Sequence, residues 1–471
     1  MATVYDLLII GAGSAGLEAA DFALRLGAKV ALVEKDRIGG GCTWSGCIPS
    51  KALLAAAATS HTLKSAGAQP LAFSDAIARV DSARLNISAG ETPDVLRHKG
   101  VDVFIGACQF LDPNTVDAGG ETLRGKRFLI ATGAVPSIPP LPGLDSVGYL
   151  TYLELFDLKE LPDSLLIMGG GPIGIEMAQA FSRLGSRVTV VEMSDRILPL
   201  EEPEASSLIE ERLKAGGVTL LTGVRAEGVR AEGSGITVRL EDAEVSGSAL
   251  LVATGRRADA SDLGLDAAGV SLEERGIGVD KFLRTNQHHI FAAGDVTGSY
   301  QFTHFAGWQA AIAVRNALLP GLKDAGVPVM AWATYTDPEV ARVGMSEAQA
   351  RKEYGDSIEV FMLPFAKVDR AVLVGSPDGF VKVIRRKGLL RDGLLGATVV
   401  GERAGELIHE WVLACGGKAG LGDLAGSVHV YPTFSMANQQ AAIEIQARRY
   451  LDGWRASVVR GLIKAYLRSA G

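Results

Sequence analysis

The sequence predicts an α/β protein with two units of alternating strands and helices, followed by a C-terminal α+β domain. A glycine-rich turn between an apolar run and a helical pattern occurs twice, at residues 11–16 and 169–174. A second apolar run follows each helix, which is the order of a parallel βαβ unit. Past residue 325 there is no further glycine motif, and strand-like runs at residues 380–386 and 394–401 precede helical ones.

Length and composition favour a multidomain globular protein. The 471 residues exceed one hydrophobic core, and 47% of them are hydrophobic. The net charge of -7 argues against a nucleic-acid partner. Asp6 interrupts the first apolar run, so that run predicts a strand rather than a signal peptide, and no run of 18 apolar residues predicts a membrane span. We expect a cytoplasmic protein.

The first unit carries a dinucleotide-binding fingerprint in its required context. The apolar run Leu7–Ile10 leads directly into Gly11-x-Gly13-x-x-Gly16, a helical pattern follows, and a second strand ends at Glu34. Gly11 allows a tight turn, and Gly13 lets the backbone approach a pyrophosphate at the helix N-terminus. Glu34 is placed to accept hydrogen bonds from a ribose.

The fingerprint recurs and predicts a second dinucleotide. Gly169, Gly171 and Gly174 repeat the turn, and the following strand ends at Glu192. A protein that binds two dinucleotides can pass a hydride between them, and a flavin with a nicotinamide is the natural pair. Glu192 would repel a 2′-phosphate, so NAD is favoured, although the nearby Arg196 leaves NADP open.

Three further strand ends carry small or acidic residues. Ala131–Gly133 and Ala253–Gly255 both read Ala-Thr-Gly, which allows close approach to a ligand. Gly294-Asp295 follows another apolar run. An acid at this position suits a hydroxyl-rich chain such as ribityl, whereas a turn with an Asp cap is the alternative.

Cys42 and Cys47 form a close pair in the segment GCTWSGCIPSK. The spacing, the lack of a histidine in the segment and the lack of a second pair argue against zinc. A helical pattern begins near Pro49, and its N-terminus, together with Lys51, would stabilise a thiolate. A redox couple is therefore favoured over a structural disulfide, which would have to persist in a reducing compartment.

These motifs resemble the pyridine nucleotide-disulfide oxidoreductases, and especially the branch of dihydrolipoamide dehydrogenases and mercuric reductases. The matching segments are GAGSAG, GGGCTWSGCIPSK, ATGAVP, GGGPIGIE, AAGD and YTDPEVARVGMSE. The resemblance implies two Rossmann-like domains for FAD and NAD, an interface domain, and a homodimer whose active site is shared across subunits. The expected boundaries are 1–145 for the first FAD-binding part, 146–257 for the NAD domain, 258–325 for the second FAD-binding part, and 326–471 for the dimerisation domain.

The resemblance also implies roles for individual residues. Cys42 corresponds to the interchange thiol, Cys47 to the thiol beside the flavin, and Lys51 pairs with Glu176, while Asp295 holds the ribityl chain. The expected FAD contacts are Gly11, Gly13, Ser14, Gly16, Glu34, Lys35, Gly41, Thr43, Ala131, Thr132, Gly133, Gly294 and Asp295. The expected NAD contacts are Gly169, Gly171, Pro172, Ile173, Gly174, Glu192 and Gly255. No metal ligands are expected.

The chain departs from the family in its last motif, SVHVYPTFSM. His429 matches the first histidine of that motif, but Tyr431 stands where the partner-supplied catalytic histidine is expected, and Met436 replaces its glutamate. A phenol titrates near ~10 and an imidazole near ~6.5, so Tyr431 is a poor base at neutral pH. His429 shares a face with Tyr431 on an extended segment, so it either substitutes or is a structural residue of the interface.

The sequence leaves the electron acceptor open. A small disulfide, lipoamide-like, is the first candidate. A metal ion such as Hg²⁺ needs no base, but no cysteine follows Cys415 to deliver it. A quinone could take electrons from the flavin directly, and a redox sensor or assembly subunit is the non-enzymatic alternative. A basic amphipathic helix ends the sequence, and its packing against this subunit or a dimer mate is favoured over membrane contact.

Overall fold

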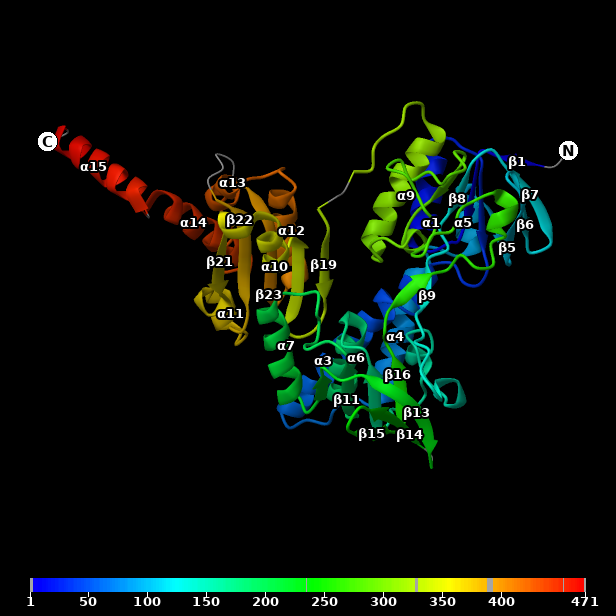
Figure 1. The fold of residues 1–471 in the computed structure, drawn as a ribbon, viewed down its shortest axis with the longest axis horizontal. Helices are drawn as coiled ribbons and strands as arrows, with labels where there is room; N and C mark the ends of the chain where they lie inside the picture. The colour runs from blue at the N-terminus through cyan, green and yellow to red at the C-terminus, as the bar shows by residue number, and fades with distance from the viewer. Residues whose placement is uncertain (1–2, 234, 327–328, 388–392, 452, 470–471) are drawn as a thin grey trace. The chain divides into compact units, whose positions relative to one another are not determined.

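The computed structural model describes residues 3–233, 235–326, 329–387, 393–451 and 453–469 (Figure 1). The chain divides into two compact units. The first comprises residues 1–197 and 213–327, and the second comprises residues 198–212 and 328–471. Each unit is described by itself below. The division into four domains stays a prediction.

A parallel sheet forms the centre of the first unit. Its strands run in the order β18-β8-β2-β3-β4, and all neighbours are parallel. The expected strand Leu7–Ile10 is β2, buried along its whole length. Helices α1 and α9 pack against each other and contribute alanines to the core beside the sheet (Figure 1). The bounds are β2 Leu7–Ile10, α1 Ser14–Arg25, β3 Val30–Glu34, β4 Asp102–Ile105, β8 Phe128–Ile130, β18 Ile290–Ala292 and α9 Thr303–Leu318.

A second, smaller sheet completes this part of the core, and the sequence did not predict it. Its order is β1-β7-β6-β5, with antiparallel pairs from β7 to β5. The buried side chains Phe110 and Val116 pack with Leu8 and Phe128 of the parallel sheet. The bounds are β1 Val4–Tyr5, β5 Cys108–Asp112, β6 Thr115–Ala118, β7 Glu121–Gly125 and α8 Leu265–Ala268.

The second glycine motif lies in its own parallel sheet, as the repeat predicted. The strands run in the order β12-β11-β10-β16, and α6 follows β10 directly. An antiparallel sheet, β13-β14-β15, packs its apolar side chains with those of β10 and β16. The bounds are β10 Ser164–Met168, α6 Pro172–Leu184, β11 Arg187–Glu192, β12 Thr219–Thr222, β13 Ala226–Glu232, β14 Gly235–Leu240, β15 Glu244–Gly247 and β16 Ala249–Val252.

The two cysteines lie on different helices. Cys42 is in the middle of the short helix α2, and Cys47 is the first residue of α3, so only Cys47 lies in the first turn of the long helix. Helix α3 contacts both α4 and α6. The bounds are α2 Gly40–Trp44, α3 Cys47–Ser65, α4 Phe73–Ser88, α5 Pro93–Lys99, β9 Ala134–Pro136 and β17 Arg256–Ala258.

The second unit is an antiparallel sheet with helices, which confirms the expected α+β domain. The order is β19-β20-β23-β22-β21, and the buried Trp411 of α12 packs into the core of this sheet. The expected strands 380–386 and 394–401 are β22 and β23. The bounds are α7 Pro203–Ala215 (residues 203–212 belong to this unit), β19 Ala331–Thr334, β20 Glu339–Gly344, α10 Glu347–Tyr354, β21 Ile358–Pro364, α11 Asp369–Leu373, β22 Phe380–Arg386, β23 Leu394–Gly401, α12 Ala404–Cys415, α13 Leu421–Gly426, α14 Met436–Leu451 and α15 Gly453–Ser469.

The last helix narrows one expectation, which was that it packs against its own subunit or a dimer mate. Three of its apolar side chains are exposed in the single chain: Leu462 by 66%, Ile463 by 51% and Tyr466 by 71%. These three side chains therefore do not pack against their own subunit. The apolar face expected for this amphipathic helix also includes Leu451 and Trp454, whose side chains lie outside those that the structure describes. No helix within the described ranges is both long and apolar enough to cross a membrane.

Candidate active site

The first glycine turn brings two strand ends together. Gly11 has φ +101°, and a Cβ added there would lie 2.5 Å from the carbonyl oxygen of Ala131. A Cβ on Gly16 would lie 1.9 Å from the carbonyl oxygen of Gly11. Only glycine fits at these two positions, because any side chain would drive α1 away from β2 and β8. The turn and the Ala-Thr-Gly strand end therefore meet at one edge of the sheet.

The second glycine turn repeats this geometry. A Cβ on Gly169 would lie 2.4 Å from the carbonyl oxygen of Ala253, and one on Gly174 would lie 2.0 Å from that of Gly169. By contrast, a Cβ on Gly171 would meet no atom within 4 Å, and one on Gly13 would meet only Gly40 Cα, at 3.8 Å. The space beside each helix N-terminus is therefore open to a phosphate, which fits a dinucleotide at both sites.

Both strand-end glutamates are held by backbone amides. Glu34 accepts hydrogen bonds from Ala12 N (2.7 Å) and Asp36 N (2.9 Å). Glu192 accepts them from Gly170 N (2.6 Å) and Ser194 N (2.7 Å) in the same relative positions. Each carboxylate is thereby fixed beside its glycine turn, where a ribose would lie.

Other expected FAD contacts gather near the first turn. Thr132 Oγ1 donates to the carbonyl of Asp259 at 2.6 Å, and Lys35 forms an ion pair with the Asp259 carboxylate at 2.7 Å. Asp295 forms an ion pair with Arg256 at 2.5 Å. Burial raises the pKa of the Asp295 carboxyl, and the Arg256 charge opposes that shift. The role of Asp295 toward a ribityl chain stays a prediction.

The cysteine pair is electrostatically asymmetric. The hydrogen bond from Cys42 lowers the pKa of Cys47 to about 6; burial opposes this shift, and Thr303 and the Lys51 charge add to it. The same hydrogen bond, together with burial, raises the pKa of Cys42. Thr303 Oγ1 lies 3.4 Å from Cys47 Sγ. In the reduced pair, Cys47 is therefore the thiolate and Cys42 the thiol at neutral pH.

An ion pair lies beside this thiolate. Lys51 of α3 binds both carboxylate oxygens of Glu176 on α6, at 3.0 and 2.8 Å. Glu176 is buried, whereas the Lys51 side chain is 35% exposed. The Lys51 charge lowers the pKa of Cys47 and the Glu176 charge raises it. The structure thus brings together four of the six predicted catalytic residues: Cys42, Cys47, Lys51 and Glu176.

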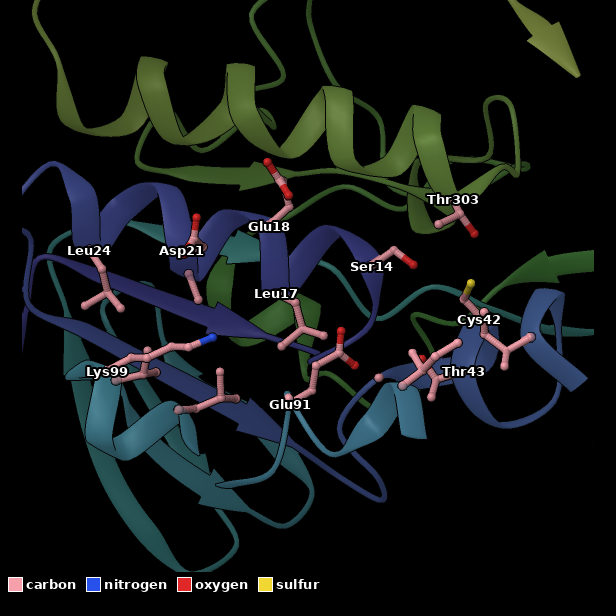
Figure 2. A pocket seen from close by; sticks show the side chains of 17 residues that line it. Ser14, Leu17, Glu18, Asp21, Leu24, Cys42, Thr43, Glu91, Lys99 and Thr303 are labelled. Carbon is pink, nitrogen blue, oxygen red and sulfur yellow. The ribbon is translucent and has the colours of Figure 1, made fainter. Parts of the chain in front are cut away.

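A cavity of about 370 Å³ opens on the Cys42 side of the pair (Figure 2). One face of α1 forms a wall of this cavity, and Cys42, Thr43 and Thr303 lie at one end. The segment after α4 forms the other wall, with Glu91 and Lys99. Sequence reasoning missed Glu91, Lys99 and Thr303 as site residues, because they belong to no fingerprint and only the folded chain brings them to Cys42.

The two remaining predicted catalytic residues lie in the second unit. His429 is bonded through Nδ1 to the carbonyl of Ser427 at 3.0 Å, and its Nε2 lies 3.4 Å from a carboxylate oxygen of Glu410. Tyr431 donates to the Asp369 carboxylate at 3.0 Å, and this bond raises the pKa of the phenol above its usual 10. At neutral pH Tyr431 is thus even less often deprotonated than an ordinary tyrosine, and so is less available to accept a proton.

Two dinucleotide sites flanking a polarised dithiol define a flavoprotein disulfide reductase. Residues 5–310 match the pyridine nucleotide-disulphide oxidoreductase family, and residues 330–442 match the dimerisation domain of that family. The chain belongs to the pyridine nucleotide-disulphide oxidoreductases. It uses FAD and a pyridine nucleotide, and the dimerisation domain supports a homodimer.

The most similar relatives include two kinds of enzyme. The chain is 36% identical over 446 residues to a mercuric reductase of Bacillus cereus, covering 92% of this chain and 70% of that protein. It is also 36% identical over 451 residues to a dihydrolipoyl dehydrogenase of Thermus scotoductus, covering 93% of this chain and 96% of that protein.

Among solved structures, the chain is similar to the HOCl-induced flavoprotein disulfide reductase RclA of Escherichia coli. The TM-score is 0.85 at 31% identity, with 93% of this chain and 99% of that chain covered. A Cu(II) complex of RclA is similar at the same TM-score, with 30% identity. Within the ranges that the structure describes, no three His, Cys, Asp or Glu side chains are placed to hold a metal ion.

Proposed function

We propose that this protein uses NADH to reduce a small disulfide through the Cys42–Cys47 couple, in the manner of a dihydrolipoamide dehydrogenase working in the reductive direction. The single observation that carries the proposal is the asymmetric pair beside a cavity. Cys47 is the thiolate on the Lys51 side, and Cys42 is the thiol that opens into about 370 Å³. A disulfide exchange centre needs one thiol that reaches the substrate and a second that resolves the mixed disulfide.

Each protein group has a role in this scheme. A flavin held at the first glycine turn would supply hydride acceptance from a nicotinamide held at the second turn and two-electron reduction of the Cys42–Cys47 disulfide. The Lys51–Glu176 pair holds the positive charge beside the Cys47 thiolate. Cys42 attacks the substrate disulfide, and Cys47 then attacks Cys42 to release the second substrate thiol and restore the protein disulfide.

NADH is the proposed donor rather than NADPH. Glu192 is buried and held by two backbone amides, so its charge is fixed where a 2′-phosphate would have to enter. The negative carboxylate would repel the negative 2′-phosphate of NADPH, and its backbone hydrogen bonds keep it from moving aside. We further propose that the active site is completed by His429 or Tyr431 of the partner subunit. We also propose that the predicted domain boundaries hold. The protein is proposed to be cytoplasmic.

A metal ion is the second candidate acceptor. The resemblance to mercuric reductase and to a reductase solved with Cu(II) favours it, and thiolates bind soft metal ions directly.

The test is anaerobic reduction of the purified full-length protein by NADH, followed by one acceptor at a time: lipoamide, glutathione disulfide, Hg²⁺ and a quinone. Iodoacetamide labelling and peptide mass spectrometry would follow Cys42 and Cys47 before and after NADH. We expect both thiols to become labelled after NADH and lipoamide to be turned over. Cys42→Ser should abolish disulfide turnover and spare quinone turnover. Turnover of Hg²⁺ or quinone alone would reject the disulfide proposal, and unchanged labelling after NADH would favour a sensor or assembly role.

A further inference from the structure

The cavity beside Cys42 contains an unused carboxylic acid. Glu91 follows α4 in the loop before α5, and its side chain points into the cavity near Leu17 and Thr43 (Figure 2). One of its carboxylate oxygens, Oε2, is shielded from solvent and has no hydrogen-bond partner among the described residues. The residue as a whole is half-buried, and burial of its carboxyl raises the pKa above the ordinary value. A shielded oxygen without a partner is costly to keep charged, so this group is suited to exchanging a proton.

The chemistry at Cys42 requires a proton carrier. The hydrogen bond to Cys47 and burial raise the pKa of Cys42, so its sulfur carries a proton when the pair is reduced. That proton must leave as the sulfur attacks, and the departing substrate thiolate must gain one. Tyr431, at the position of the family's base, has a pKa raised by Asp369 and cannot easily accept a proton at neutral pH.

The other titratable groups that line the cavity suit this task less well. Asp21 forms an exposed ion pair with Arg25 at 2.8 Å. Glu18 lies on the α1 wall, one turn before Asp21, and in Figure 2 its carboxylate points toward α9. Lys99 is exposed, and its charge lowers the pKa of Glu91, while burial has the larger, opposite effect. Glu91 is therefore the cavity carboxyl whose surroundings most favour a reversible proton.

We propose that Glu91 is the general acid–base for the substrate sulfur, supplied by the same subunit as Cys42; this inference rests on the disulfide reductase function proposed above. The Glu91 carboxylate takes the Cys42 proton as the Cys42 sulfur bonds to one substrate sulfur. The substrate S–S bond breaks, and Glu91 returns the proton to the departing thiolate. Cys47 then displaces the second thiolate, which takes a proton from water, and the two electrons of the dithiol have reduced the substrate.

The decisive experiment uses two neutral disulfides with different leaving groups on the full-length holoenzyme. Lipoamide releases an alkyl thiolate that needs a proton, whereas 4,4′-dithiodipyridine releases a stabilised thiolate that does not. We expect Glu91→Gln to lower kcat/KM for lipoamide by about 10²-fold, since a general acid contributes ~10² to 10⁴. The loss for 4,4′-dithiodipyridine should be clearly smaller, because Cys42 must still lose its proton but the leaving group needs none. Glu91→Asp should recover part of the lipoamide rate.

Two further measurements separate this role from a structural one. The exposed Asp94→Asn in the next helix is the matched control and should behave as the wild type. In a Cys47→Ser background, the pH dependence of Cys42 alkylation by iodoacetamide reports on Cys42 without turnover. Adding Glu91→Gln should lower the pH midpoint of this alkylation, because it removes a negative charge from the cavity.

The outcomes also separate the two proposals. Equal losses on both disulfides, or no loss on either, with an unchanged alkylation midpoint would overturn the role of Glu91 while the reductase stands. A wild-type protein that reduces neither disulfide in a Cys42-dependent way would overturn the reductase and the role of Glu91 together.

Discussion

Cys42 and Cys47 share one hydrogen bond, and that bond decides which sulfur is charged. We predict that Cys42→Ala raises the pKa of Cys47 from about 6 by roughly one to two units, because the largest cause of the depression is removed. The measurement is the pH dependence of Cys47 alkylation in the reduced protein. Cys42→Ser keeps a hydroxyl donor and should shift the midpoint less; identical midpoints in both variants would contradict the assignment.

The same shift links the reduced protein's stability to pH. The pKa of Cys47 is lower in the folded protein than the ordinary value of 9.0. Ionisation of Cys47 therefore favours the folded state fully above pH 9, and this contribution is lost as the pH falls from 9 through 6. We predict that reduced wild-type protein loses more thermal stability than Cys47→Ser between pH 9 and pH 6. Parallel pH profiles of the melting temperature would contradict this.

We expect the charge of Glu192 to set the preference between NADH and NADPH. We predict that Glu192→Gln raises kcat/KM for NADPH relative to NADH by roughly tenfold, a change of about 1.4 kcal/mol, because the repulsion of a 2′-phosphate is removed. Glu34→Gln is the matched control, since Glu34 has equivalent backbone hydrogen bonds at the other site. An unchanged NADPH to NADH ratio would show that another group sets the preference.

At the scale of the helix and strand, two glycines of the second turn have different roles: Gly174 is needed for packing, and Gly171 leaves room for a ligand. A Cβ at Gly174 would lie 2.0 Å from a carbonyl oxygen, whereas one at Gly171 would meet no atom within 4 Å. We predict that Gly174→Ala lowers both the melting temperature and NADH affinity, while Gly171→Ala keeps the melting temperature and loses affinity only. Calorimetric unfolding and NADH titration would measure the two. Unimpaired NADH binding by Gly171→Ala would place the pyrophosphate elsewhere.

A buried charge cluster attaches residues 198–212 to the sheet of the second unit. Lys382 of β22 is 1% exposed and lies 2.9 Å from Glu202, 2.9 Å from Glu204 and 2.8 Å from Glu347. Glu202 is equally buried. Such a cluster is stabilising only while it is complete, because each charge has lost its hydration.

We predict that Lys382→Met destabilises the folded protein by about 3–5 kcal/mol, since it leaves the Glu202 carboxylate buried without its cation. Denaturant unfolding would measure the loss. The exposed Lys387→Met, near the end of the same strand, should change the unfolding free energy by less than about 0.5 kcal/mol. Equal effects of the two substitutions would mean that the cluster is not a distinct source of stability.

The sequence predicted a strand correctly where the strand's own residue pattern was sufficient to identify it. Strands 7–10, 380–386 and 394–401 are continuous apolar or alternating runs, and the structure has them at those bounds. The small sheet of β5–β7 was missed because its strands are short and only partly apolar. Glu91 gave no signal at all, since its meaning depends on a cavity wall built from segments far apart along the chain.

At the scale of the whole molecule, the shared motifs identify the family. The features particular to this chain lie in the segment around Tyr431 and in helix α15. The glycine turns, the dithiol and the Lys51–Glu176 pair follow from patterns that the family model matches over residues 5–310. Neither Tyr431 nor the exposed apolar face of α15 follows from them. We therefore expect the acceptor and the assembly to depend on the parts of the chain that general motifs do not describe.

The exposed face of α15 gives the last prediction. Leu462 and Tyr466 are apolar side chains that are 66% and 71% exposed, on a helix that follows the matched dimerisation domain. We predict that they pack against a second copy of the chain. Light scattering should give twice the 49.4 kDa chain mass for the wild type. Leu462→Glu with Tyr466→Glu should weaken the dimer at least about tenfold, since each buried large apolar side chain contributes about 1.5–3 kcal/mol.

The charge-reversed pair Arg460→Glu with Lys464→Glu, on the same helix, should leave that mass unchanged. If both double variants remain dimeric on dilution, α15 does not contribute to the dimer. Anionic vesicles would then distinguish a membrane role: cosedimentation of the wild type that is lost in both variants would show that α15 binds lipid through its apolar and basic faces together.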